Sequence, residues 1–186
     1  MSPNILIFFS LLLELICCGF ILLSIFRLLR VDYFNPIVRL FIKSLDPVQK
    51  IFMFFLPPLL ASILVAVVLR SASLFVAFPT ETLVSLFIIS IFYVLMLSLI
   101  IIFWCILGAA ILSWVQPNSS NPLLQIIQEI ADKALNPIRK FMPPAGGLDF
   151  TPIIGIMILN FISFGILRAA LPPETHPFYL FQQLIG

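Results

Sequence analysis

The chain has 186 residues, of which 62% are apolar and only 10% charged, and its mean hydropathy is +1.20. An average soluble domain is about half apolar and about a quarter charged. A core of the size that this length allows cannot hold so many Leu, Ile and Phe side chains, so many of them must face lipid. The composition therefore predicts an integral membrane protein, and the net charge of +2 is too small to indicate a nucleic-acid partner.

Four apolar runs are long enough to cross a membrane as helices. About 20 helical residues, rising about 1.5 Å each, span a hydrocarbon core of about 30 Å. The runs cover residues 5–29, 59–78, 83–112 and 152–171. The first run is too long and wrongly flanked for a cleaved signal peptide, so we expect it to remain in the protein. The third run exceeds the length of a perpendicular span, and we expect it to tilt.

A mixed segment follows the first run and another follows the third, at residues 30–58 and 113–151. Each carries polar side chains at helical spacing, with Ile, Leu, Val and Phe covering the other side. This pattern is typical of an amphipathic helix that lies in the membrane interface, and a solvated loop helix is the alternative. The two polar stripes consist of Arg39, Lys43, Asp46 and Lys50, and of Gln125, Gln128, Glu129, Asp132 and Asn136.

The chain matches itself at an offset of 86 residues, the separation of Asn35 and Asn121. No gap is needed across the loops, which predicts two tandem units at residues 1–80 and 81–186. Each unit would consist of a span, an amphipathic helix and a second span. Because each unit crosses the membrane twice, both begin on the same side, and the repeats are parallel. The matched pairs are Asn35 and Asn121, Pro36 and Pro122, Asp46 and Asp132, and Pro57-Pro58 and Pro143-Pro144.

The repeated prolines have a physical role in this arrangement. Pro36 and Pro122 suit the first turn of a new helix, so each Asn-Pro pair is expected to turn the chain from the span into the amphipathic helix. In the second unit, Gly146 and Gly147 permit a sharp reversal before the last span. We expect Thr151 to cap that span, and Asp149 to place a favourable negative charge near its N-terminus.

The basic residues are distributed unevenly along the chain. Eight of the ten lie in or beside the mixed segments, and the other two, Arg70 and Arg168, lie within spans. The positive-inside rule then places both mixed segments in the cytoplasm and both termini outside. The eight are Arg27, Arg30, Arg39, Lys43, Lys50, Lys133, Arg139 and Lys140. We expect them to lie among anionic lipid headgroups, with a specific partner of Arg139 and Lys140 as the alternative.

Few residues offer catalytic or metal-binding chemistry. His176 is the sole histidine, so neither a multi-histidine metal site nor a Ser/His/Asp set can be assembled. Cys17, Cys18 and Cys105 lie inside apolar runs, where we expect them to pack as small residues, with lipidation or redox chemistry as the alternative. The sequence thus predicts no enzyme activity, no metal and no cofactor.

Two ionisable residues, Glu14 and Arg70, fall within the first and second spans. Counted from the outer ends of their antiparallel helices, both lie about 12–14 Å deep. An ion pair between them would lower the cost of about 2.5–3.5 kcal/mol that a lone charge incurs near mid-bilayer. The alternatives are that Arg70 extends to the headgroups beside a protonated Glu14, or that the two residues belong to a proton or ion path.

The second mixed segment contains a specific motif, in which Pro137-Ile-Arg139-Lys140 is followed by Pro143-Pro-Ala-Gly146-Gly147-Leu-Asp149. With this motif and the Asn-Pro turns, the whole chain resembles the YggT family of bacterial and plastid membrane proteins. The first unit lacks the glycine turn. The resemblance implies a bacterial inner-membrane protein connected with osmotic or extracytoplasmic stress and ion homeostasis. For other branches of the family, the resemblance implies a connection with cell-division loci or with the assembly of plastid membrane complexes, including cytochrome maturation.

These observations predict an all-α membrane protein without catalytic activity. We expect it to organise or assist other membrane components, with anionic lipid headgroups and other membrane proteins or further copies of itself as partners. The alternative is a component of an ion channel or transporter. Polar residues within the spans are too few to favour a pore.

Overall fold

The computed structural model describes residues 3–78, 80–115, 120–141 and 149–167. Every regular element in these ranges is helical. The elements are α1 (Pro3–Leu28), α2 (Pro36–Met53), α3 (Pro58–Ala77), α4 (Leu83–Val115), α5 (Pro122–Phe141) and α6 (Thr151–Asn160), which continues as a π-helical segment, η1 (Phe161–Leu167).

Three of these helices, α1, α3 and α4, are long and apolar enough to cross a membrane. The protein is therefore an all-helical membrane protein, as the composition predicts. The predicted fourth span corresponds to α6 and η1, which the structure describes as far as Leu167. Its remaining residues lie outside the described part of the chain, so the count of four spans stays a prediction.

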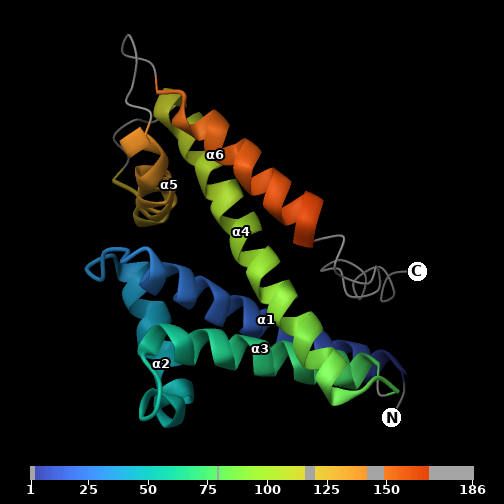
Figure 1. The fold of residues 1–186 in the computed structure, drawn as a ribbon. Coiled ribbons are helices and arrows are strands. Elements are labelled where there is room, and N and C mark those ends of the chain that lie inside the picture. Colours follow the sequence, from blue (N-terminus) through green and yellow to red (C-terminus); the bar gives the residue numbers. More distant parts are fainter. Residues whose placement is uncertain (1–2, 79, 116–119, 142–148, 168–186) are drawn as a thin grey trace.

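The helices form two groups that share α4. Helix α1 packs along α3, and the first half of α4 packs on α3. The second half of α4 diverges from α3 and packs instead on α5 and α6 (Figure 1). Helix α4 has 33 residues, about 50 Å of helix, and runs diagonally to α1 and α3, as expected for a helix longer than the hydrocarbon core.

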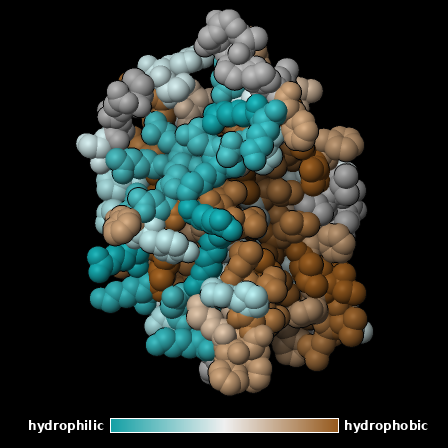
Figure 2. Space-filling model, turned by 60° about the vertical axis from the view of Figure 1, so that its left-hand side comes forward, coloured by the Kyte–Doolittle hydropathy of each residue, from teal (hydrophilic) through white to brown (hydrophobic). Residues whose placement is uncertain are grey.

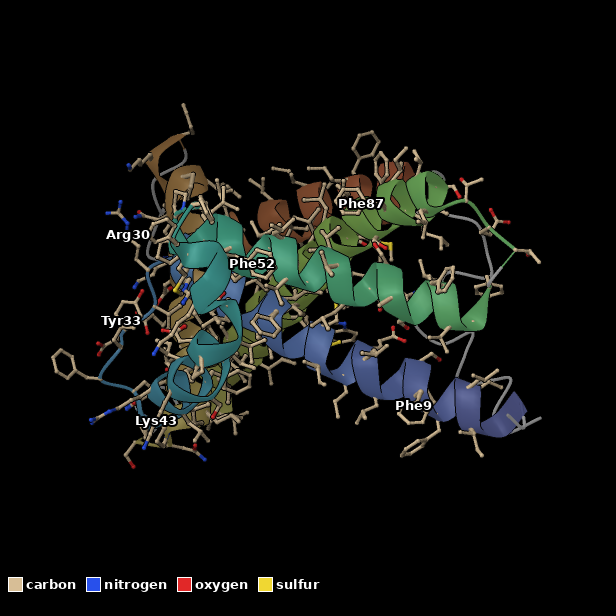
Figure 3. The ribbon with its side chains drawn as sticks, turned by 90° about the horizontal axis from the view of Figure 1, so that it is seen from below. Phe9, Arg30, Tyr33, Lys43, Phe52 and Phe87 are labelled. Atoms are coloured by element: carbon tan, nitrogen blue, oxygen red, sulfur yellow. The ribbon has the colours of Figure 1, made fainter. Side chains whose placement is uncertain are left out.

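Helices α2 and α5 lie at the same end of the molecule, and the N-terminus and the end of η1 lie at the other (Figure 1). Hydrophilic residues gather on one side of the surface and hydrophobic residues on the other (Figure 2). Arg30, Tyr33 and Lys43 lie at the end that carries α2, whereas Phe9 and Phe87 project from the sides of α1 and α4 (Figure 3). We call the end with α2 and α5 the basic end.

The apolar faces of the amphipathic helices pack on the spans. A β-carbon at Gly19 of α1 would lie 3.5 Å from Leu45 of α2, and one at Gly108 of α4 would lie 3.3 Å from Ile127 of α5. The first distance is an ordinary van der Waals contact, whereas the second is tight, so the glycine at Gly108 lets α4 and α5 approach closely. On the polar sides of the two helices, Lys43 and Asp132 are exposed.

Candidate functional site

The Asn-Pro pairs begin both amphipathic helices. The Asn35 Oδ1 atom accepts the Ile37 N–H at 3.0 Å, and the Asn121 Oδ1 atom accepts the Leu123 N–H at 2.9 Å. Pro36 and Pro122 open α2 and α5. The Nδ2 group of Asn35 also donates to the Pro122 carbonyl at 2.9 Å, which joins the two helix starts.

The loop between α1 and α2 contacts α5. The Glu129 carboxylate accepts the Asp32 N–H at 2.9 Å and pairs with Lys133 at 2.5 Å. Lys133 also donates to the Arg30 carbonyl. Arg30 has a φ of 55°, the left-handed conformation that usually favours glycine, and Val31 donates its N–H to the Phe26 carbonyl to close the end of α1. Part of the polar stripe of α5 thus binds the loop between α1 and α2.

In the first half of the chain, Arg27 and Asp46 together join three helices at the basic end. The Asp46 Oδ1 atom pairs with Arg27 of α1 at 2.5 Å and accepts a hydrogen bond from Gln49 at 2.8 Å. Arg27 also donates to the Pro58 carbonyl at the start of α3, at 2.6 Å. Arg27 therefore holds the amphipathic helix and the start of the returning helix together.

Asp132 makes a similar connection in the second half. Arg139 pairs with Asp132 at 3.0 Å and with Asp149, just before α6, at 3.1 Å. The Asp149 Oδ1 atom accepts the Thr151 N–H at 2.9 Å. The expectation that Thr151 caps the last span is wrong, because the Thr151 hydroxyl instead donates to Asp149, whose carboxylate caps the helix start.

The charge state of Asp149 follows from these contacts. Partial desolvation acts to raise the pKa of the Asp149 carboxyl, but the hydrogen bonds from Thr151 and the nearby Arg139 guanidinium outweigh it. The net effect is a pKa below the ordinary value of 3.8. Asp149 thus stays ionised at neutral pH and complements the positive N-terminal end of α6.

Asp46 and Asp132 occupy the same position in the 86-residue self-match, and each binds an arginine that reaches the start of the next apolar helix. The arginines come from different places, Arg27 on α1 and Arg139 on α5. Sequence reasoning noted the paired aspartates but missed their partners. The signal available in the sequence was the match of the two carboxylates, which indicates that each has a similar role in its unit.

The other motif residues are only partly described. Pro137 lies inside α5, and Lys140 lies in its last turn with Arg139. Both Pro137 and Lys140 are exposed. Pro143, Gly146 and Gly147 lie outside the described residues, so the predicted glycine turn stays a prediction.

Within the spans, the structure brings Glu14 and Arg70 together. Their charged groups lie 3.3 Å apart, and the two residues are 8% and 1% exposed. Tyr93 of α4 completes the cluster: its hydroxyl donates to Glu14, and its ring lies 3.9 Å under the Arg70 guanidinium. We call Glu14, Arg70 and Tyr93 the intramembrane cluster. It joins three helices, and Arg70 points into it rather than toward the headgroups.

Weaker polar contacts surround the intramembrane cluster. Ser73 donates to the Ser10 carbonyl at 3.0 Å, and Ser71 donates to the Ser90 hydroxyl at 3.0 Å. The Cys17 thiol lies 3.2 Å from the Ala66 carbonyl, consistent with a packing role. Hydrogen bonds of this kind between membrane helices contribute about 0.6 kcal/mol each on average.

Besides a small apolar cavity of about 290 Å³ between α1 and α2, two larger cavities lie outside the intramembrane cluster. An apolar groove of about 560 Å³ runs between α3 and α4, with the end of α1 at one side. A more polar cavity of about 630 Å³ lies among α4, α5 and α6, beside Asp132, Arg139 and Asp149. No residue of the intramembrane cluster lines either cavity. Among the residues described, no group of three or more His, Cys, Asp or Glu could hold a metal ion.

The long apolar helices, with their charges buried between them, define a multi-pass helical membrane protein. The family model for CCB3/YggT matches residues 81–170. The chain belongs to the YggT family, since it is 31% identical to YggT of Escherichia coli K12 over 140 residues, 73% of this chain and 74% of that protein.

Other relatives extend this comparison. An uncharacterised protein of Pseudomonas aeruginosa is 30% identical over 169 residues, which is 86% of this chain and 84% of the relative. The chloroplastic YlmG homolog protein 2 of Arabidopsis thaliana is 36% identical over 64 residues, 34% of this chain and 24% of that protein. No solved structure matches the chain significantly.

Proposed function

We propose that the protein is a non-catalytic component of the bacterial inner membrane that organises or assists other membrane components. The observation that carries this proposal is the intramembrane cluster. Glu14 and Arg70 contact each other and Tyr93 with almost no exposure, so they stabilise the helix packing and do not line an open polar path. A pore or transport route needs polar groups that a permeating ion can reach.

The exposed surface supports association with other molecules in the membrane. Many large apolar side chains of the spans face outward, including Leu15, Phe8 and Trp104, which are 70%, 61% and 62% exposed. At the basic end, the exposed polar side chains of α2 and α5 offer a second surface. Together these features suit a protein that binds neighbours along its sides and at one end.

The proposed topology has four spans in two parallel units, with the basic end in the cytoplasm and both termini outside. The order of a long apolar helix, an amphipathic helix and a returning apolar helix occurs twice, and α2 and α5 share one end of the molecule. An alkaline phosphatase fused to the C-terminus should be active, and one inserted near Ser119 should be inactive. The opposite pair of activities would reverse the orientation.

A flux measurement separates this proposal from an ion channel or transporter. The purified protein is reconstituted into liposomes, and K⁺, Na⁺ and proton fluxes are compared with protein-free liposomes and with a Glu14→Gln variant. We expect no flux above the protein-free level. A flux that the wild-type protein supports and Glu14→Gln abolishes would replace the proposal with a transport function. A role in osmotic or extracytoplasmic stress is proposed on family resemblance alone, and growth of a deletion strain at high osmolarity tests it.

A further inference from the structure

The apolar groove between α3 and α4 carries an inference beyond the proposed function. Its lining comes from the end of α1, the first half of α3 and the first two thirds of α4. These are parts of helices that can span the membrane, so hydrocarbon is the solvent at the groove. Its volume of about 560 Å³ lies within the range of about 300–1,000 Å³ that is usual for ligand pockets.

The lining offers no free polar group to a ligand. Among the described residues, Ser24 and Ser98 are the only polar ones that line the groove, and their hydroxyls donate to carbonyls of their own helices, Ile21 and Val94. The other lining residues are Leu, Ile, Val and Phe. The occupant must therefore be apolar where it lies in the groove.

The side-chain sizes distinguish between two apolar occupants. Transmembrane helices approach each other closely where Gly, Ala, Ser or Thr lie at the contact. The groove is lined by neither Gly nor Ala, and its two serines are already engaged. A lining of branched and aromatic side chains suits a flexible hydrocarbon chain better than a second helix.

Charge indicates the orientation of that chain. Leu28 and Leu56 line the groove at the basic end, and the exposed Arg30 follows Leu28 by two residues. Figure 3 places Arg30 at the basic end and Phe87, which lines the groove, toward the other end. A phosphate headgroup at the basic end would thus meet a cation while its acyl chain lies in the groove.

We propose that the groove between α3 and α4 is a binding site for an anionic phospholipid, with one acyl chain in the groove and the headgroup phosphate at Arg30. Native mass spectrometry of the purified full-length protein tests it, with phosphatidylglycerol and phosphatidylcholine of identical chains as probes. Wild-type protein should retain one phosphatidylglycerol more strongly than phosphatidylcholine. Arg30→Gln should remove that preference.

Groove-filling variants provide the decisive comparison. Leu95 and Leu60 line opposite walls and are 48% and 49% exposed, so tryptophan can replace either one without entering the core. Ile111 of α4 is 55% exposed and lies outside the groove, which makes Ile111→Trp the matched control. Leu95→Trp and Leu60→Trp should bind phosphatidylglycerol about tenfold more weakly, the effect of losing about two buried methylene groups. The control should bind normally.

Three results would overturn the proposal. One is equal lipid retention by Leu95→Trp, Leu60→Trp and Ile111→Trp. Another is loss of a dimer in the groove variants with lipid binding unchanged, which would assign the groove to a second copy of the chain. The third is equal retention of both lipids by the wild-type protein, which would show that the headgroup does not contribute to binding at this site. Thermal unfolding confirms that each variant is folded.

Discussion

Removal of either charge from the intramembrane cluster should destabilise the protein, but not to the same degree. Arg70 is 1% exposed, so Glu14→Gln leaves a buried guanidinium cation beside a neutral amide in place of a carboxylate. Breaking a buried pair in this way costs about 3–5 kcal/mol. Arg70 keeps its contact with the Tyr93 ring in this variant, so we expect a loss of stability near the lower limit, about 3 kcal/mol.

Arg70→Gln should cost less, about 1–3 kcal/mol, because the Glu14 carboxyl keeps the hydrogen bond that the Tyr93 hydroxyl donates. Tyr93→Phe removes the hydroxyl that donates to Glu14 but keeps the ring under Arg70, so it measures the hydrogen bond alone. We expect a loss of about 1.5–3 kcal/mol for that variant.

The double variant Glu14→Gln/Arg70→Gln should be more stable than the sum of the single losses predicts, by about 1–3 kcal/mol. Reversible unfolding in mixed detergent micelles, followed by circular dichroism, gives the four free energies of unfolding. Additivity within about 0.5 kcal/mol would show that the two charges do not interact. A greater loss of stability for Arg70→Gln than for Glu14→Gln would refute this ranking of the two single variants.

Three further sets of variants test packing, capping and backbone strain, each by thermal unfolding in detergent. A β-carbon at Gly155 would lie 2.5 Å from Leu135, so Gly155→Val should lose about 1–3 kcal/mol, whereas Gly165→Val, with nothing closer than 3.8 Å, should lose clearly less; equal losses would contradict the close approach. Because the pKa of Asp149 is lowered, its ionised form stabilises the fold above about pH 4, and that contribution disappears as pH falls through the lowered pKa. The difference between wild type and Asp149→Asn should therefore be larger at pH 6 than at pH 3, and a constant difference would oppose this role. Arg30→Gly should gain about 1 kcal/mol by relieving the φ of 55°, while Arg30→Ala should not, and equal effects of the two would show that the turn is unstrained.

The elements that depend on local pattern were predictable from the sequence. Hydropathy located α1, α3 and α4 to within a few residues, because a helix in lipid must satisfy its own backbone and cover itself with apolar side chains. The helix starts at Pro36 and Pro122 followed from the fixed φ of proline and its restriction of the preceding residue. Helix α4 nevertheless extends to Val115, three residues beyond the predicted run, because Ser113 and Trp114 do not break a helix.

Contacts between distant residues were harder to predict. Counting residues from the outer ends of the helices placed Glu14 and Arg70 at the same depth in the membrane, and the structure brings them into contact. Tyr93 was missed, although it lies ten residues after Leu83, about 15 Å along α4 and so at a similar depth. Extending the same arithmetic to phenol groups would have found it. The partners of Asp46 and Asp132 could not be read from periodicity, because they depend on how the helices meet.

Site-specific photo-crosslinking in native membranes tests the central claim, association with other membrane components, most directly. A photoreactive residue is placed at Trp104, which is 62% exposed on α4, and separately at Ile106 of the same helix, which is 2% exposed. The account predicts that Trp104, together with a second exposed position such as Leu15, captures the same identifiable membrane protein and that Ile106 does not. Crosslinks from both exposed positions that reach only lipid or copies of this chain would contradict it.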